Sequence, residues 1–223
     1  MVMPLGHLQA NAPTVNLLLR GRNIRMGSTG NFLIKGIDIQ EIIDALDSFH
    51  AQSWVVVHFS FGLKNMLEGQ AAFLLSKELE EKAQESMKHA KKLAERIAEL
   101  GGIETADPTE FVMLSPLKRF SMPSSTSDVK VILSYILEQE QTIIRKYGDF
   151  MIKIRDKDDL TYHLLCEILE DEIRRESEIE VVFINSSGDF ETNKIQKTED
   201  QSNPQPQRSK IWGLNNNVIE CDS

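Results

Sequence analysis

The strongest constraint on this chain is a helical repeat of apolar residues that runs through positions 39–184. Apolar side chains recur there three, four and seven positions apart, which is typical of amphipathic helices that pack on one another. The repeat is interrupted at a few short polar, glycine-containing or proline-containing segments. The pattern therefore predicts four helices, over 39–68, 70–100, 127–154 and 158–184.

The lengths of the connections predict how these helices are arranged. The first two helices are joined at 68–70 and the last two at 155–157. Links as short as these place consecutive helices side by side and antiparallel. The middle connection, 101–126, starts with two glycines, contains three prolines and is long enough to cross the full length of a bundle. The sequence therefore predicts an all-α four-helix bundle with one long crossover between helices two and three.

The two ends of the chain differ in composition from the helical part. Up to Ile37 there are arginines, a lysine and several glycines but no acidic residue, so we expect 1–38 to be a basic, glycine-containing extension. An organellar targeting role for that segment stays open. Residues 185–223 are polar, which predicts a tail that is flexible or ordered by a partner. The predicted bundle domain is therefore 39–184.

Composition excludes several functional classes. The 223 residues suffice for one substantial core, and the net charge of −9 disfavours general binding to nucleic acid. No uncharged apolar run approaches the roughly 18 residues that span a bilayer. Two cysteines, Cys166 and Cys221, are too few for a four-thiolate metal site. These features favour an intracellular, cytoplasmic protein without a membrane partner.

Each predicted apolar stripe carries polar residues near the middle of its helix. Six of them fall at comparable depth and predict one buried cluster: Ser53, Ser86, His89, Glu140, Glu172 and Arg175. A buried carboxylate needs a metal ion, an arginine or a proton to compensate it. A modest helix rotation that turns Glu140 or Glu172 to solvent is the alternative. The charged run 78–85, in which Lys82 stands among glutamates, is predicted to be a solvated face.

Segments of all four helices resemble the bacterioferritin and Dps-like branch of the ferritin-like superfamily. The matching segments are 79–102 on helix two, Glu140-Gln141 with Ile144 and Tyr147 on helix three, YHLLCEILEDEIRRE at 162–176 on helix four and, more loosely, HAQSW at 50–54 on helix one. The resemblance implies a ferritin-like bundle that assembles into a hollow oligomeric shell.

The resemblance also implies where a metal centre would lie. The family's diiron centre takes carboxylate and histidine ligands from all four helices. Carried over to this chain, the residual ligands are His89, Glu140 and Glu172, and the remaining ligand positions hold Ser53, Ser86 and Arg175. Serine supplies no carboxylate, and the fixed charge of arginine repels iron. We therefore interpret the site as a degenerate diiron centre in which Arg175 neutralises Glu140 and Glu172.

Two functions follow from this interpretation. The first is a ferritin-like protein without a cofactor, which has lost its ferroxidase activity and serves as a structural or interaction subunit of a homo- or hetero-oligomer. The alternative is an iron-oxidising and iron-storing protein whose rearranged site recruits nearby side chains, with His50, Glu85 and Glu176 as the candidates. A third function, nucleic-acid binding through the basic N-terminal arm, is disfavoured by the acidic total charge and the lack of a lysine-rich tail.

Overall fold

The computed structural model describes residues 31–117 and 122–186 and contains five helices within those ranges. They are α3 (Ile39–Met66), α4 (Gly69–Glu99), α5 (Pro108–Leu114), α6 (Val129–Ile154) and α7 (Asp159–Ser186). The four long helices confirm the predicted all-α bundle, with bounds close to those expected. Residues 1–30 and 187–223 lie outside the described residues, so the expectations for the basic extension and the polar tail remain predictions.

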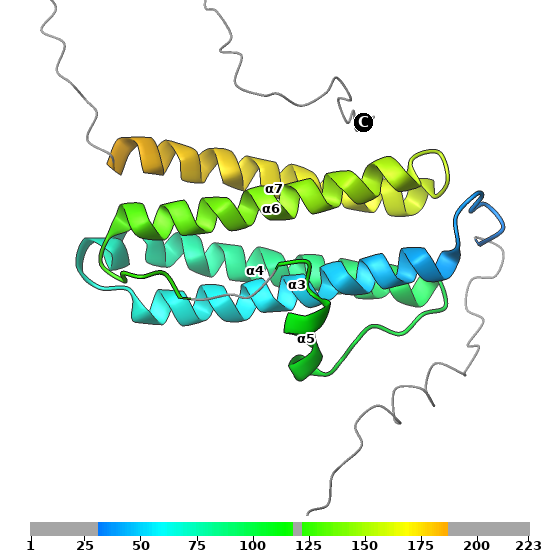
Figure 1. Cartoon of the computed structure of the whole chain (residues 1–223), viewed down its shortest axis with the longest axis horizontal. Coiled ribbons are helices and arrows are strands. Elements are labelled where there is room, and N and C mark those ends of the chain that lie inside the picture. The colour runs from blue at the N-terminus through cyan, green and yellow to red at the C-terminus, as the bar shows by residue number, and fades with distance from the viewer. Residues whose placement is uncertain (1–30, 118–121, 187–223) are drawn as a thin grey trace, which may run out of the picture.

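The long helices form two antiparallel hairpins, α3–α4 and α6–α7, that lie one over the other (Figure 1). The crossover between the hairpins contains the short helix α5, which packs against α3. The Ser48 hydroxyl donates to the Leu114 carbonyl over 2.8 Å, and Thr105 donates to Asp47 through its backbone N–H and its hydroxyl, each over 2.7 Å. The crossover is therefore attached to α3 at two points.

Short local signals fix where the helices begin and end. Asp38 caps α3 by accepting from the Gln40 backbone N–H, and Asp128 caps α6 in the same way. After α4, Gly101 has a φ of +83°, a left-handed conformation that glycine adopts without steric cost. A Cβ on the next residue, Gly102, would lie 2.9 Å from a methyl carbon of Ile43, so the chain passes close to α3 there.

Two clusters of buried apolar side chains fill opposite ends of the bundle interior. One, toward the α6–α7 link, includes Leu46 and Leu93, and the other, toward the α3–α4 turn, includes Leu63, Leu75 and Leu133. A group of buried polar and charged residues lies between these clusters, near the middle of the long helices. The fold therefore places a polar layer between two apolar ones.

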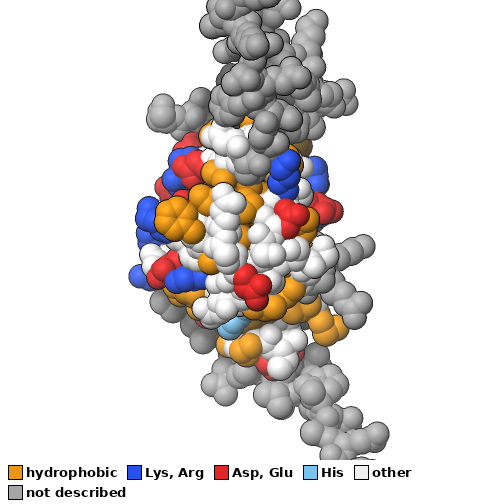
Figure 2. All heavy atoms as spheres, turned by 90° about the vertical axis from the view of Figure 1, so that its left-hand side faces the viewer, with side chains coloured by type: hydrophobic (Ala, Val, Ile, Leu, Met, Phe, Trp, Pro, Cys, Tyr) orange, Lys and Arg blue, Asp and Glu red, His pale blue; other side chains and the backbone are white. Residues whose placement is uncertain are grey.

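The surface carries isolated apolar side chains among charged ones. Figure 2 shows this mixture at the end of the bundle where α3 turns into α4. Met66, Phe73 and Leu74 are exposed around that turn, and Phe73 keeps 87% of its surface in solvent. Over the described ranges, no helix has the length and apolar character needed to span a membrane.

Candidate functional site

All six polar residues singled out from the sequence are buried in the middle of the bundle. They are Ser53, Ser86, His89, Glu140, Glu172 and Arg175, with exposed fractions between 2% and 6%. Each long helix contributes at least one of them. A rotation that would turn Glu140 or Glu172 toward solvent is not observed. The chemistry of the site therefore depends on which cations face these two carboxylates.

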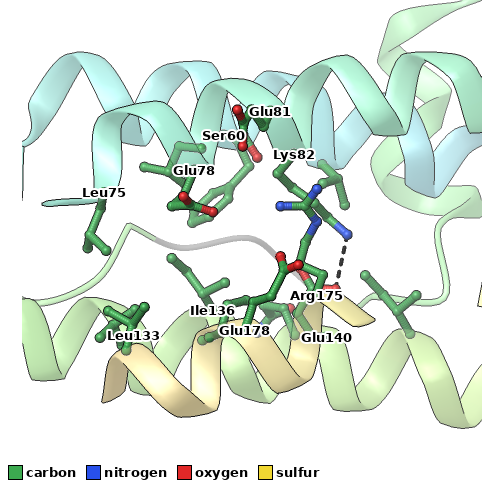
Figure 3. A pocket seen from close by; sticks show the side chains of 17 residues that line it. Ser60, Leu75, Glu78, Glu81, Lys82, Leu133, Ile136, Glu140, Arg175 and Glu178 are labelled. Atoms are coloured by element: carbon green, nitrogen blue, oxygen red, sulfur yellow. Dashed lines mark hydrogen bonds and ion pairs between the residues drawn. The ribbon is translucent and has the colours of Figure 1, made fainter. Parts of the chain in front are cut away.

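The cation at the centre is Lys82 of α4. Its ammonium lies 3.0 Å from the Oε2 oxygen of Glu140 on α6 (Figure 3). The same ammonium also donates to Glu172 on α7. Only 5% of Lys82 is exposed, so the expectation that it belongs to a solvated face is wrong. The physical reason is its position three residues after Leu79 and four before Ser86, on the stripe of α4 that faces the other hairpin.

Arg175 has a different partner from the one expected. Its Nε donates to an oxygen of Glu85 on α4 over 2.9 Å, and a terminal guanidinium nitrogen contacts the same oxygen. The other Glu85 oxygen accepts from Arg174 over 2.9 Å. Arg175 is therefore not the main counter-charge of Glu140 and Glu172, because its planar fork is already engaged by Glu85. Glu85, a candidate recruited metal ligand, is held by two arginines.

His89 connects α4 to two carboxylates of α7. Its Nδ1 lies 3.3 Å from Glu172, and its Nε2 lies 3.2 Å from an oxygen of Asp171. Asp171 also accepts from Arg174 over 2.8 Å. The sequence analysis missed Asp171, although its position beside Glu172 and one turn from Arg174 was a usable signal. The two contacts fix the orientation of the imidazole ring.

The charges of this mid-bundle cluster, defined as Lys82, His89, Glu140 and Glu172, shift the pKa values of its carboxyls in opposite directions. Burial raises the pKa of Glu140 to about 8, against the opposing effect of the Lys82 ammonium and with a further contribution from Glu172. Burial also acts to raise the pKa of Glu172, but Lys82 and His89 outweigh it and hold that pKa below its ordinary range. One ammonium cannot neutralise two buried carboxylates, so Glu140 keeps a proton at neutral pH.

Lys82 and Arg175 remain charged in this environment. Burial acts to lower the pKa of Lys82, but the Glu140 and Glu172 carboxylates outweigh it, and the pKa is raised. For Arg175 burial is again opposed, in this case by Glu85, and the pKa is raised. Both side chains therefore act as fixed cations in the interior.

The remaining predicted site residues lie beside or outside the cluster. The Ser53 hydroxyl donates to the Phe49 carbonyl one turn earlier, over 3.0 Å. His50 faces a separate aromatic group, in which the Trp54 Nε1 donates to its Nε2 over 3.1 Å. Glu176 has its pKa raised by burial. The structure therefore does not bring His50 to the carboxylates of the cluster.

The arrangement of donors bears directly on metal binding. Within residues 31–117 and 122–186, no three His, Cys, Asp or Glu side chains are grouped so that they could hold a metal ion. The space between Glu140 and Glu172 is occupied by the Lys82 ammonium. Chemically, the cluster can hold a proton on Glu140 while the Glu172 carboxylate forms an ion pair with Lys82.

Comparison with protein families gives one clear match. Residues 43–184, more than half of the chain, match the model of the ferritin-like domain. A DNA protection during starvation protein from Pyrococcus furiosus is 28% identical over 160 residues, which cover 71% of this chain and 86% of that protein.

Solved structures show the same fold. The bacterioferritin-related protein of Bacteroides fragilis, described as a dodecameric thioferritin, superposes with a TM-score of 0.66 at 23% identity, over 72% of this chain and 94% of that one. Dps from Staphylococcus aureus superposes with a TM-score of 0.59 at 17% identity, over 65% of this chain and 95% of that one. The likeness covers the bundle.

Proposed function

Because the chain belongs to the ferritin-like domain family, in its Dps-like branch, we propose that it is a bundle of this type in which a lysine has replaced the metal centre. In this proposal the protein is a structural or interaction subunit of an oligomer and has no ferroxidase activity. The observation that carries the proposal is the Lys82 ammonium, which is bound to Glu140 and Glu172 at once.

The donor set does not fit a diiron centre. Such a centre in this kind of bundle uses a glutamate from each of two helices and a Glu-x-x-His motif from each of the other two. This chain has Ser53 and Ser86 where the resemblance implies two of the glutamates. A metal ion between Glu140 and Glu172 would also have to displace the ammonium of Lys82. We therefore assign iron no role as a resident cofactor.

The rearranged iron site is the competing function. Of its candidate ligands, Glu85 binds Arg174 and Arg175, and His50 accepts from Trp54. Recruiting either one would break these contacts, which costs free energy. This supports the structural role over the iron-oxidising one.

Assembly and domain organisation are part of the same proposal. The Bacteroides fragilis protein is described as dodecameric, and a bundle of the same fold offers comparable faces for oligomer contacts. We assign the bundle to 39–184 and treat 1–38 and 185–223 as assembly elements. The name of the Pyrococcus furiosus relative refers to DNA, but the net charge of −9 here does not support a nucleic-acid partner.

The test is aerobic loading with Fe(II). We expect oxidation at the background rate and little retained iron, measured by absorbance and by metal analysis after desalting. A matched variant restores the implied ligand positions with Ser53→Glu, Ser86→Glu and Arg175→His and removes the ammonium with Lys82→Ala. It should retain more iron than wild type. Fast oxidation by wild type with about two irons retained per chain, as a diiron bundle site requires, would establish the competing function.

A further inference from the structure

A cavity of about 280 Å³ lies between the two hairpins, next to the mid-bundle cluster. Its walls come from all four long helices and are mainly apolar, with Leu79 on α4, Leu133 on α6 and Val182 on α7 among the lining residues. Figure 3 shows Leu75 and Leu133 at one end and Lys82, Arg175 and Glu140 at the other. The cavity therefore has an apolar end and a charged end.

Carboxyl groups outnumber cations among the residues that line the cavity. Four glutamates line it, namely Glu78, Glu81, Glu140 and Glu178, against the two cations Lys82 and Arg175. Both cations are already paired, Lys82 with carboxylates of the mid-bundle cluster and Arg175 with Glu85, which is not among the lining residues. The cavity therefore has no cation left to receive an anion.

Three carboxylates lie where the cavity meets solvent, and they outnumber the cations that contact them. Glu81 lies 3.0 Å from Lys77 and Glu178 lies 3.9 Å from Arg174, whereas no described cation lies within ion-pair distance of Glu78. Glu81 and Glu178 are exposed and Glu78 is half-buried, so their carboxylates surround the entrance. In the close-up, Glu78 from α4 and Glu178 from α7 approach the same space from opposite sides (Figure 3). An anion that enters must pass these carboxylates, whereas a cation is attracted to them.

We propose that this cavity binds a small amphipathic cation, an alkylammonium whose hydrocarbon chain fills the apolar end and whose charged group is held by the glutamates at the entrance. This site is separate from the proposed structural role of the cluster and does not depend on it. The Lys82 side chain is itself an ammonium on a hydrocarbon chain, and the bundle interior holds it beside Glu140.

The volume sets the size of the ligand. An apolar cavity of about 150 Å³ binds benzene, which has six non-hydrogen atoms, so 280 Å³ accommodates a ligand of about ten. Octylammonium has that size and the required charge. Octanoate and 1-octanol have nearly the same shape with opposite or no charge, so the three compounds separate the effect of charge from that of apolar burial.

The experiment is titration of the full-length protein with octylamine at neutral pH, followed by calorimetry. We expect saturable binding of one molecule per chain, with octanol and octanoate weaker by about tenfold or more. The double variant Glu78→Gln/Glu178→Gln should weaken octylammonium binding by about fivefold, the effect of losing partly solvated charges. The matched control Glu138→Gln/Glu170→Gln changes two exposed glutamates outside the cavity and should leave the affinity unchanged.

A second pair of variants locates the ligand. Val182→Phe and, independently, Ile136→Phe reduce the cavity from two different helices, and circular dichroism checks that each variant folds. Each should abolish binding. The proposal is overturned if octanoate or octanol binds as tightly as octylamine, or if folded cavity-filling variants bind it as wild type does.

Discussion

Two buried ion-pair clusters in the part of the chain that the structure describes differ in how their charges balance. The mid-bundle cluster sets the single ammonium of Lys82 against two carboxylates. The second cluster, called the end cluster here, consists of Arg96, Asp158 and Thr161 and joins the C-terminal part of α4 to the start of α7. One guanidinium there faces one buried carboxylate.

The buried part of the end cluster is balanced, since the second carboxylate that contacts Arg96, that of Glu99, is exposed. One terminal nitrogen of Arg96 donates to both Asp158 oxygens, over 3.0 and 3.2 Å, and its Nε donates to the Thr161 hydroxyl over 2.9 Å. Thr161 in turn donates to Asp158 through its backbone N–H and its hydroxyl. The end cluster therefore joins the two hairpins through a balanced buried ion pair. In the mid-bundle cluster one ammonium faces two carboxyl groups, and the raised pKa of Glu140 lets a proton restore the balance.

The largest expected effect comes from removing the mid-bundle cation. Lys82→Met leaves Glu140 and Glu172 buried without their ammonium, which should lower the free energy of unfolding by about 3–5 kcal/mol. Arg175→Met is the matched comparison, because Glu85 keeps Arg174 and the cost should be about 1 kcal/mol. Urea midpoints of both variants measure the difference. A larger loss for Arg175→Met would mean that the pairing of cations and carboxylates is the reverse of the one described.

Removing the end-cluster cation should lower the free energy of unfolding by less than removing Lys82 does. Arg96→Met leaves Asp158 with its hydrogen bonds from Thr161, so the expected loss is about 2–3 kcal/mol, the size of hydrogen bonds to a charged group. A double-mutant cycle with Asp158→Asn isolates the coupling between the two side chains. If the coupling energy is near zero, the end-cluster ion pair does not join the hairpins and the comparison fails.

A third effect concerns the pH dependence of stability and sharpens the comparison most. Because the folded-state pKa of Glu140 is raised to about 8, the folded protein binds a proton that the unfolded chain releases at pH values above its ordinary pKa of 4.5. Stability should therefore fall as pH rises from about 5 to 8, by at most about 1.4 kcal/mol per pH unit. The lowered pKa of Glu172 acts only in more acid solution, where its contribution is lost as pH falls.

Glu140→Gln tests this assignment. The amide has the shape of the protonated carboxyl, so the variant should be about as stable as wild type near pH 5 and should lose most of the slope up to pH 8. Unfolding by urea at several pH values measures both. An unchanged slope would show that a group other than Glu140 binds the proton. The contrast in charge balance between the two buried clusters would then lose its support.

The fold was predictable from sequence because its signals are local and repeated. The apolar stripes, the short link at 68–70 and the paired glycines at Gly101 and Gly102 each specify an element without knowledge of its partners. The short helix α5 was missed, although Asp107 followed by Pro108 is a common start of a helix. Its seven residues are too few to show a periodic pattern.

The sequence predicted most of the residues that form the polar layer, but not which cation pairs with which carboxylate. Heptad spacing identified Glu140 and Glu172 as buried, and the same spacing from Leu75 through Leu79 would have placed Lys82 with them. Lys82 was instead read with the glutamates next to it in sequence. Whether Arg175 turns toward Glu140 or Glu85 depends on side-chain torsions and on the spacing of the two hairpins, which no sequence pattern contains.

The Lys82 ammonium is covalently part of the chain, and this affects how the stability of the protein depends on its surroundings. A dissociable ion stabilises a folded protein in proportion to the logarithm of its free concentration, so such proteins weaken when the ion becomes scarce. A counter-ion that is synthesised as part of the polypeptide has no such dependence, because its amount always equals that of the chain. We therefore expect the stability of this bundle to be the same whether iron is scarce or abundant.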